Sequence, residues 1–339
     1  MTRTHAFASV AMLALVGSAA SAAINPWDFN VFSRSTIGTA GSPYGSDYQG
    51  AAGSVGNAFF NGFSLRDIAS SSPSLAQSFY GGGTFTLGGA VTNGGIEVAG
   101  NVTLNSASIA GTITSGGSLF GSGGGTVNGH VTLAGGNLAG PTLTLNGGLT
   151  TGAAFVPTVD VGGVSSFLLA QSNAAAALAD NNTLVNINFG GEYLVNLNPG
   201  VNVVSIAASA LGAANNYGFT VNGAGAPGAT LIINVVGGGA ATLDSTTWTY
   251  SNGASSLRTL LNYNGATSLA LSGGNKVNFL APNAAVHYSS GVVEGNLYAG
   301  SLTGSGQVNW IGGFEGTIPS PSAFIALGGG LVLAGRRRR

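Results

Sequence analysis

The sequence predicts a mostly β protein, a β-helix (solenoid) accompanied by one amphipathic helix. Three observations predict this fold: 59 of the 339 residues are glycine, only 6% are charged, and short runs with apolar residues at every second position recur along the chain. Average proteins contain about 7% glycine and about 25% charged residues. Period-two alternation is typical of a strand with one buried face, and glycine clusters permit tight corners between strands. Cysteine is absent, which excludes disulfides and thiolate sites.

The first 22 residues have the three parts of a secretory signal peptide. Arg3 gives the positive charge, residues 6–16 are apolar, and Ala20-Ser21-Ala22 is a cleavage site of small residues. We therefore expect residues 1–22 to direct export and to be removed. A buried N-terminal helix is the alternative.

The last 22 residues have a second tripartite pattern. It consists of Pro319, Ser320, Pro321 and Ser322, an apolar stretch over 323–335, and then Arg336, Arg337, Arg338 and Arg339. As a helix the apolar stretch would span about 20 Å, less than the ~30 Å of a bilayer core. The arginines would hold this end at the cytoplasmic face. This order resembles the PEP-CTERM sorting signal of Gram-negative bacteria, with Ser320 where that family usually has Glu. The resemblance implies a transient inner-membrane anchor and an exosortase-type processing enzyme as partner. A plain C-terminal anchor is the alternative.

The first part of the body, residues 81–148, alternates short β-patterned runs with glycine clusters. The runs are 84–87, 96–98, 102–104, 131–133 and 142–145. Asn-Gly dipeptides, whose residues tolerate positive φ, predict corners at 61–62, 93–94, 128–129, 146–147, 222–223, 252–253 and 264–265. A sandwich of hairpins also fits such runs, but their shortness and the small corner residues favour a solenoid. The spacing of the runs is irregular, so we do not expect a clean repeat array.

One segment, residues 164–180, predicts an amphipathic helix lying along the β body. Ser165 or Ser166 is expected to cap its start, and Asn181 or Asn182 to end it. The predicted apolar face consists of Phe167, Ala170, Ala174 and Leu178. An alanine-rich linker is the alternative.

Further strands are expected after this helix. Residues 231–236 are nearly all apolar, which predicts a strand buried on both faces. Residues 246–250 and 268–271 follow a β pattern, and 276–310 predicts short strands with glycine corners. We expect no internal domain boundary between residues 24 and 316.

Several segments of the body resemble the choice-of-anchor A family. Residues 47–57 are similar to its opening motif, and residues 261–269 and 279–284 are similar to two later elements. The matching positions are Asp47, Gly50, Asn57, Ala281, Pro282, Asn283, Gly295, Asn296 and Phe314. The resemblance implies that residues 23–317 form one β-helical domain akin to ice-binding-like adhesive domains, and that these positions are structural.

Two of these motifs also have a direct physical interpretation. Pro282 cannot donate a backbone hydrogen bond, so residues 281–283 predict a turn between two strands, closed by the Asn283 side chain. Residues 294–296 then predict the next corner.

The sequence points to no catalytic, cofactor or metal site. His5 would leave with the signal peptide, and His130 and His287 lie far apart without partners at metal-ligand spacing, so both are expected to be solvated. The ten acidic residues are dispersed, and no nucleophile or phosphate-loop motif occurs. After loss of both ends, Arg34, Arg66, Arg258 and Lys276 face ten acidic residues, a formal net charge of −6. We therefore expect no nucleic-acid partner.

Two patterns could serve binding. Thr-x-Thr occurs at 84–86, 112–114, 142–144 and 247–249, and aligned pairs could order water and bind ice. Alternatively, threonine is simply a favourable outward residue in strands. Trp248, Tyr250 and Trp310 could stack on sugars or pack in the core or rim.

Together these observations predict an exported, non-enzymatic cell-surface or extracellular-matrix protein, adhesive or structural in an exopolysaccharide or biofilm setting. Its expected partners are extracellular polysaccharide or a cell surface. An ice-binding protein and a polysaccharide-active enzyme on a β-helix are the alternatives.

Overall fold

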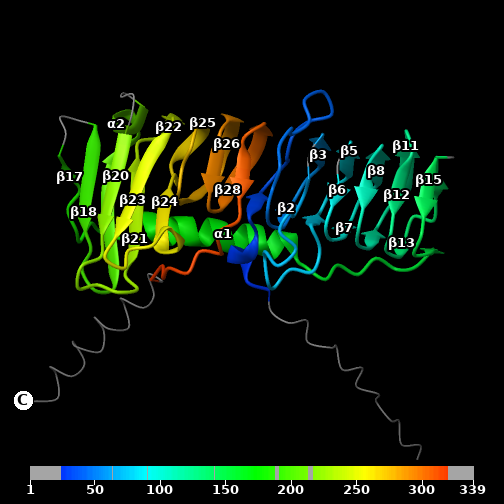
Figure 1. Cartoon of the computed structure of the whole chain (residues 1–339), viewed down its shortest axis with the longest axis horizontal. Coiled ribbons are helices and arrows are strands. Elements are labelled where there is room, and N and C mark those ends of the chain that lie inside the picture. The colour runs from blue at the N-terminus through cyan, green and yellow to red at the C-terminus, as the bar shows by residue number, and fades with distance from the viewer. Residues whose placement is uncertain are drawn as a thin grey trace, which may run out of the picture.

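The structure is a computed structural model that describes residues 24–319, except 63, 90, 141, 188–190 and 213–216. Short strands wind into a β-solenoid with three faces, and α1 (Val161–Ala176) lies along it (Figure 1). The predicted β-helix with one accompanying helix is therefore confirmed. The predicted signal peptide, Ser320–Ser322 and Arg336–Arg339 lie outside the described residues. Among the described residues, no helix has both the length and the apolar character needed to cross a bilayer.

The first face is a long parallel sheet, part of which α1 covers. In spatial order its strands are β16 (Leu149–Thr151), β13 (Val131–Leu133), β10 (Ile113–Ser115), β7 (Ile96–Val98), β4 (Phe79–Gly81), β2 (Ala52–Ser54), β1 (Val31–Ser33), β28 (Leu297–Gly304), β26 (Asn278–Ser290), β24 (Thr259–Asn262), β21 (Thr230–Val236) and β19 (Val201–Ala207).

The second face, called the open face below, also runs the length of the solenoid. It comprises β14 (Leu138–Ala139), β11 (Leu119–Ser122), β8 (Val102–Asn105), β5 (Phe85–Gly88), β3 (Ala58–Asn61), the C-terminal parts of β28 and β26, β25 (Ala266–Ser272) and β22 (Gly239–Leu243). Ile37 joins its two halves, because it bridges Leu302 on one side and Ala58 on the other.

The third face is built from shorter sheets. They contain β15 (Leu143–Leu145), β12 (Gly125–Val127), β9 (Ser108–Ile109) and β6 (Val91–Thr92), then β29 (Gln307–Asn309) and β27 (Val292–Glu294), and finally β23 (Thr246–Ser251), β20 (Tyr217–Asn222), β18 (Glu192–Asn196) and β17 (Val185–Asn186). The remaining elements are η1 (Pro26–Asp28), α2 (Ala208–Gly212) and η2 (Ser256–Arg258).

The chain enters this solenoid in the middle. From β1 it winds outward to β16 at one end, returns through residues 152–160 and α1, and then winds back from β17 through β19 to β28. β28 pairs with β1 in parallel register, Leu297 with Val31, so the first and last coils meet (Figure 1). The two halves thus share one continuous core.

The N-terminal half has a regular repeat, which corrects the expectation of irregular spacing. Ile96 pairs with Ile113, Ile113 with Val131, and Val131 with Leu149, so each coil takes 17 or 18 residues. The repeat is hard to find in the sequence because the three strands of a coil are separated by corners of variable length. Within it, the predicted period-two alternation holds.

Glycines at the corners serve mainly close packing between coils. Only the dipeptide Asn252-Gly253 has both residues at positive φ, at 53° and 87°. A Cβ on Gly129 would lie 2.4 Å from the carbonyl carbon of Gly111, and one on Gly147 would lie 2.3 Å from that of Gly129. The Asn-Gly prediction of corners is therefore correct there, but the physical reason is contact with the preceding coil.

The predicted helix exists, with different ends and a different buried face. Its N-cap is Asp160, whose Oδ1 accepts from Gly163 N at 2.9 Å, so Ser165 and Ser166 lie inside it. The residues buried against the solenoid are Val164, Ser165, Leu168, Ser172, Ala174 and Ala175, whereas Ala170 is exposed. Buried serines are stable here because the solenoid satisfies them: Ser172 Oγ donates to Asn262 Oδ1 at 2.6 Å, and Asn262 Nδ2 donates to the Ser172 carbonyl at 3.1 Å.

The predicted turn at Ala281-Pro282-Asn283 is wrong. These residues lie inside β26, where the register to β28 shifts between Ala281 and Ala285. A bulge accommodates proline in a strand because the ladder needs no N–H at that point. The strand thereby bends from the first face to the open face.

Two other expectations are confirmed. Gly295 forms the predicted corner with φ 152°, and a Cβ there would lie 2.4 Å from the Val277 carbonyl oxygen. β21 is buried on both faces up to Val235, since Ile233 faces the solenoid core while Ile232 packs with Ala175 of α1.

Candidate binding surface

The four Thr-x-Thr pairs do not share a surface. Thr86 lies on β5 of the open face, Thr114 on β10 of the first face, and Thr144 and Thr249 on the third face in opposite halves. A threonine row that sequence spacing did not indicate runs along the first face, where Thr114 pairs with Thr132 and Thr132 with Thr150.

Trp248 is not exposed. It is 9% accessible and stacks on Phe219 at 4.4 Å between ring centroids, with Tyr250 on its other side at 6.1 Å. Tyr250 and Trp310 are half-buried, and Tyr250 Oη donates to the Lys276 carbonyl at 2.7 Å. The stack therefore belongs to the core of the C-terminal half.

Both remaining histidines are exposed, as expected. His130 precedes β13, and its Nε2 lies 2.9 Å from Thr150 Oγ1, while His287 Nδ1 lies 3.1 Å from Thr303 Oγ1. Within the described residues, no three His, Asp or Glu side chains come together in a group that could hold a metal ion.

The motif residues make contacts within the fold. Asp47 Oδ1 accepts from Ser64 N at 2.7 Å, and Asn57 Oδ1 accepts from Thr84 N at 2.9 Å. Asn283 accepts from Arg34 Nη1 at 3.1 Å and donates to the Asn264 carbonyl at 3.0 Å. The remaining motif side chains are buried near η1: Asn296 Nδ2 donates to the Gly312 carbonyl at 3.2 Å, Phe314 packs on Trp27 with centroids 5.0 Å apart, and a Cβ on Gly50 would lie 2.5 Å from Asn30 Cβ.

One basic side chain, Arg66, is buried without an acidic partner among the described residues. Its Nη1 donates to the Gln77 carbonyl at 3.0 Å and its Nη2 to the Ser71 carbonyl at 2.9 Å. Burial lowers the pKa of the Arg66 guanidinium, whose charge is compensated by carbonyl dipoles. This residue holds the loop after β3 in place.

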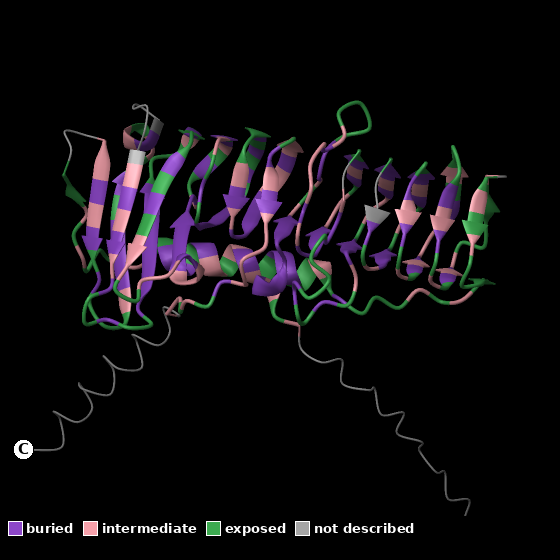
Figure 2. Ribbon diagram, viewed as in Figure 1, coloured by how far each residue is buried: buried purple, intermediate pink, exposed green. Residues whose placement is uncertain are grey.

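The open face carries a groove beside its midpoint. Its volume is about 580 Å³, and its lining residues are Ala40, Pro43, Phe59, Phe60, Asn61, Thr86, Gly88, Gly89, Asn105 and Ser106. The loop between β1 and β2 forms one wall; it projects from the edge opposite α1 and is largely exposed (Figures 1 and 2). Reciprocal backbone hydrogen bonds between Thr39 and Ser42 close this loop.

The register of the solenoid places the groove side chains in two rows. Phe59 pairs with Thr86 in one row, and Asn61 pairs with Gly88, which pairs with Asn105, in the other. Adjacent strands are about 4.8 Å apart, so the rows present groups at that spacing. The groove is therefore a neutral strip with an aromatic ring, a hydroxyl and two amides.

The polar groups of the groove are open to a ligand. Asn105 Oδ1 accepts from Ser122 Oγ at 2.7 Å, which leaves its Nδ2 as a donor. No hydrogen bond between described residues engages the side chains of Asn61 or Thr86, and both are accessible. Glycines at 88 and 89 keep the floor low, so a chain-like molecule can approach the backbone.

The sequence did not reveal this groove. Its residues are spread from 40 to 106, and only the strand register brings them together. The one signal in the sequence is the recurrence of Asn at the end of strand runs, at 61 and 105, and asparagine at such positions is equally typical of a corner.

The other half of the open face is a regular patch of small side chains. Its outward rows are Ala240, Ser268, Ala285 and Ser301, and Thr242, Ala270, His287 and Thr303. His287 is the one large side chain in these rows.

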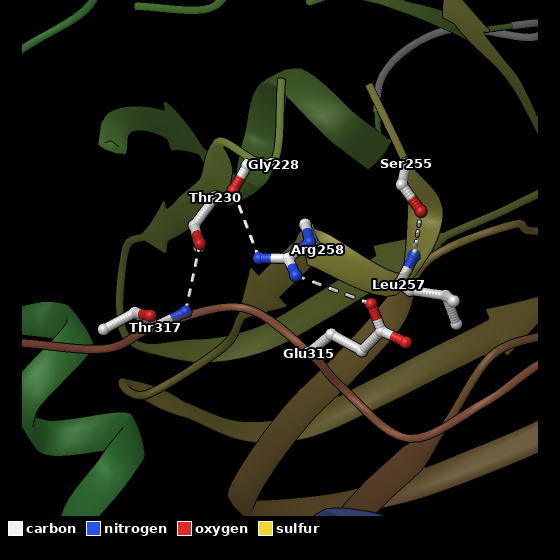
Figure 3. Close-up of polar contacts among 7 residues, drawn as sticks. All are labelled: Gly228, Thr230, Ser255, Leu257, Arg258, Glu315 and Thr317. Atoms are coloured by element: carbon white, nitrogen blue, oxygen red, sulfur yellow. Dashed lines mark hydrogen bonds and ion pairs between the residues drawn. The ribbon is translucent and has the colours of Figure 1, made fainter. Parts of the chain in front are cut away.

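The C-terminal segment is fastened to the first-face side of the molecule. Arg258 Nη2 lies 3.7 Å from Glu315 Oε2, and Thr317 N donates to Thr230 Oγ1 at 3.0 Å (Figure 3). Ile24 and Ile318 both pack on the apolar cluster beneath α1. Both ends of the described chain thus lie on the side of α1, away from the projecting loop.

Comparisons with known proteins agree with this architecture. A crystal structure of an ice-binding protein from the Antarctic ascomycete Antarctomyces psychrotrophicus is 14% identical, with a TM-score of 0.33, and the match covers 63% of this chain and 94% of that chain. An ice-binding protein from an Antarctic bacterium of the Flavobacteriaceae is 14% identical, with a TM-score of 0.28, and the match covers 83% of this chain and 80% of that chain. No curated protein matches the sequence. The family model of the ice-binding-like adhesive domain matches residues 28–310, and the chain belongs to this family.

Proposed function

We propose that this chain is an exported, non-enzymatic surface protein that adheres to neutral extracellular polysaccharide through the groove of the open face. The observation that carries the proposal is the lining of the groove, in which all ten residues are uncharged. Amides and hydroxyls match the hydroxyl groups of a sugar, and the Phe59 ring matches its C–H face. Membership of the adhesive-domain family supports the same function.

Charge on the body favours a neutral ligand over an acidic one. Between residues 24 and 319, four basic residues face ten acidic residues. An acidic polysaccharide would be repelled at long range, whereas a neutral one would be held by short-range contacts that salt does not screen.

We further propose that the chain is a choice-of-anchor A protein sorted by a PEP-CTERM signal. The tripartite order of residues 318–339 supports this, and Pro319 lies at the surface near the end of α1. An anchor attached there would leave the loop between β1 and β2, and the groove beside it, facing away from the membrane.

Removing the groove's polar and aromatic groups is expected to weaken polysaccharide binding. F59A and N105A should each raise the dissociation constant for a bound neutral glucan, galactan or mannan about tenfold, the loss typical of one well-placed contact. Affinity electrophoresis against these polymers, followed by titration with oligosaccharides, measures the effect.

The matched control is F120A, because Phe120 is an exposed aromatic in the same row as Phe59 but outside the groove. It should bind like the unmodified chain, and binding should be insensitive to added salt. The proposal fails if no neutral polymer is retained, or if only acidic polymers bind and salt releases them. Oligosaccharides recovered shortened after incubation would instead favour the enzyme alternative.

Ice binding is a second candidate, favoured by the patch on β22, β25, β26 and β28. Its outward rows of Ala, Ser and Thr follow the strand spacing of about 4.8 Å, a regular surface on which water could order. The groove, the loop and Phe59 interrupt the other half of the face. Thermal hysteresis by the purified protein, abolished by A270K but not by F59A, would favour this candidate over polysaccharide binding.

Processing of the C-terminus is expected to remove the four terminal arginines. Mass spectrometry of the extracellular protein should show loss of Arg336–Arg339, because the sorting enzyme would cut near Pro319. Substituting Pro319 and Pro321 by alanine should leave the tail intact and the protein in the membrane fraction. An intact tail on the extracellular unmodified protein would contradict the proposal.

A further inference from the structure

The end of the solenoid farthest from β19 has no cap. Its last coil, called the terminal coil below, consists of β14, β15 and β16, and each of the three is the last strand of its sheet. The chain leaves β16 along the side of the solenoid, as residues 152–160, without crossing the end (Figure 1). One edge of every strand in this coil is therefore unpaired within the described residues.

The apolar core is open at this coil. Along one inward row, Ile113 and Val131 are fully buried, whereas the next residue, Leu149, is 39% exposed. Along a second row, Leu119 is fully buried and the next residue, Leu138, is 40% exposed. In the third row Val127 is buried and Leu145 is half-exposed. The missing burial on all three faces is what one further coil would supply.

The opposite end is built differently. There α2 packs on β19 and β22, with Leu211 only 1% exposed, and β17 turns back antiparallel to β18. A head-to-tail stack of copies would have to displace this cap. The terminal coil is thus the accessible coil end of the described chain.

Protective devices common on edge strands are missing here. Residues 134–151 contain no charged side chain, and a described proline, bulge or helix does not cover the edge. Native proteins usually block unpaired edges with such features, since bare edges pair with other chains.

We infer that the terminal coil is an interface that binds the terminal coil of a second copy of this chain. Three strand edges that enclose a leucine core form a triangular rim, and the partner that matches this rim in size and chemistry is another copy of it. A two-fold axis across the solenoid would place facing strands antiparallel, which allows regular hydrogen bonding between them. The contact is isologous, so it closes as a dimer and does not continue as a filament.

The oligomeric state of the full chain tests this inference. Sedimentation equilibrium should give twice the chain mass, and L149K should raise the dimer dissociation constant at least about a hundredfold, because two like charges would meet across the axis. V236K is the matched control, since Val236 is 47% exposed on β21, away from the terminal coil, and it should remain dimeric. Circular dichroism confirms that both variants are folded.

Cross-linking gives a second readout that does not depend on stability. The chain has no cysteine, so T150C introduces a single thiol in the terminal coil. A short bis-maleimide should join T150C into a covalent dimer and leave T242C, on β22, monomeric. The inference is overturned if the protein is monomeric up to about 100 μM, if L149K remains dimeric, or if T242C cross-links as well as T150C. None of these outcomes depends on polysaccharide binding.

Discussion

Alanine in place of Gly111 is expected to cost about 3 kcal/mol or more of folding stability. A Cβ at this position would lie 2.3 Å from Gly95 N and 2.6 Å from the carbonyl carbon of Gly94, both backbone atoms of the preceding coil. Backbone in a hydrogen-bonded ladder cannot give way as a flexible side chain can. The coils would have to separate, which breaks the ladder between β10 and β7 and opens the core beneath it.

Urea unfolding followed by fluorescence measures the loss, and G41A is the matched control. Gly41 lies in the loop between β1 and β2, where an added Cβ would have no heavy atom within 4 Å and where φ is not positive. G41A should be neutral or stabilising by less than about 1 kcal/mol, because alanine restricts the unfolded chain. If G111A loses no more stability than G41A, close stacking of the coils is not what requires glycine.

Local pattern was sufficient to predict the strands. The runs at 85, 96, 102 and 131 alternate between core and solvent, and alternation depends only on neighbours in sequence. Glycine corners followed from the same reasoning, although most of them are needed for contact with another coil. The class of fold could thus be predicted without any long-range information.

Features that depend on partners distant in sequence could not be predicted. The helix rotates to bury Ser165 and Ser172 because Arg34 and Asn262 bond to them, and no periodicity within the helix indicates those partners. Pro282 remains in a strand because the register shifts beside it. The path from the middle to one end and back from the other, and the groove it assembles from residues 40–106, follow from pairing register.

The protein is expected to unfold cooperatively just above pH 10. Five tyrosines, Tyr44, Tyr48, Tyr263, Tyr288 and Tyr298, are fully buried, and burial raises the pKa of each phenol above its ordinary value. In the unfolded chain they ionise near pH 10. Because the folded pKa is the higher one, this stabilisation is complete below about pH 10 and is lost as pH rises beyond it.

The size of the effect follows from the number of buried phenols. Each tyrosine favours the unfolded state by about 1.4 kcal/mol for each pH unit above 10, so five contribute about 7 kcal/mol at pH 11. Domains of this kind have about 5–15 kcal/mol in total. The transition should therefore fall within one or two pH units of 10.

Tyrosinate absorbance and circular dichroism during an alkaline titration test this prediction. Both should change together in one steep step, since ionisation requires unfolding. Y263F is the informative variant, because no described residue hydrogen-bonds to the Tyr263 hydroxyl and phenylalanine keeps the ring in place. With one fewer phenol to ionise, its transition should move to higher pH. Gradual ionisation near pH 10 with native circular dichroism would mean that water reaches these side chains and that the coils are not closely packed.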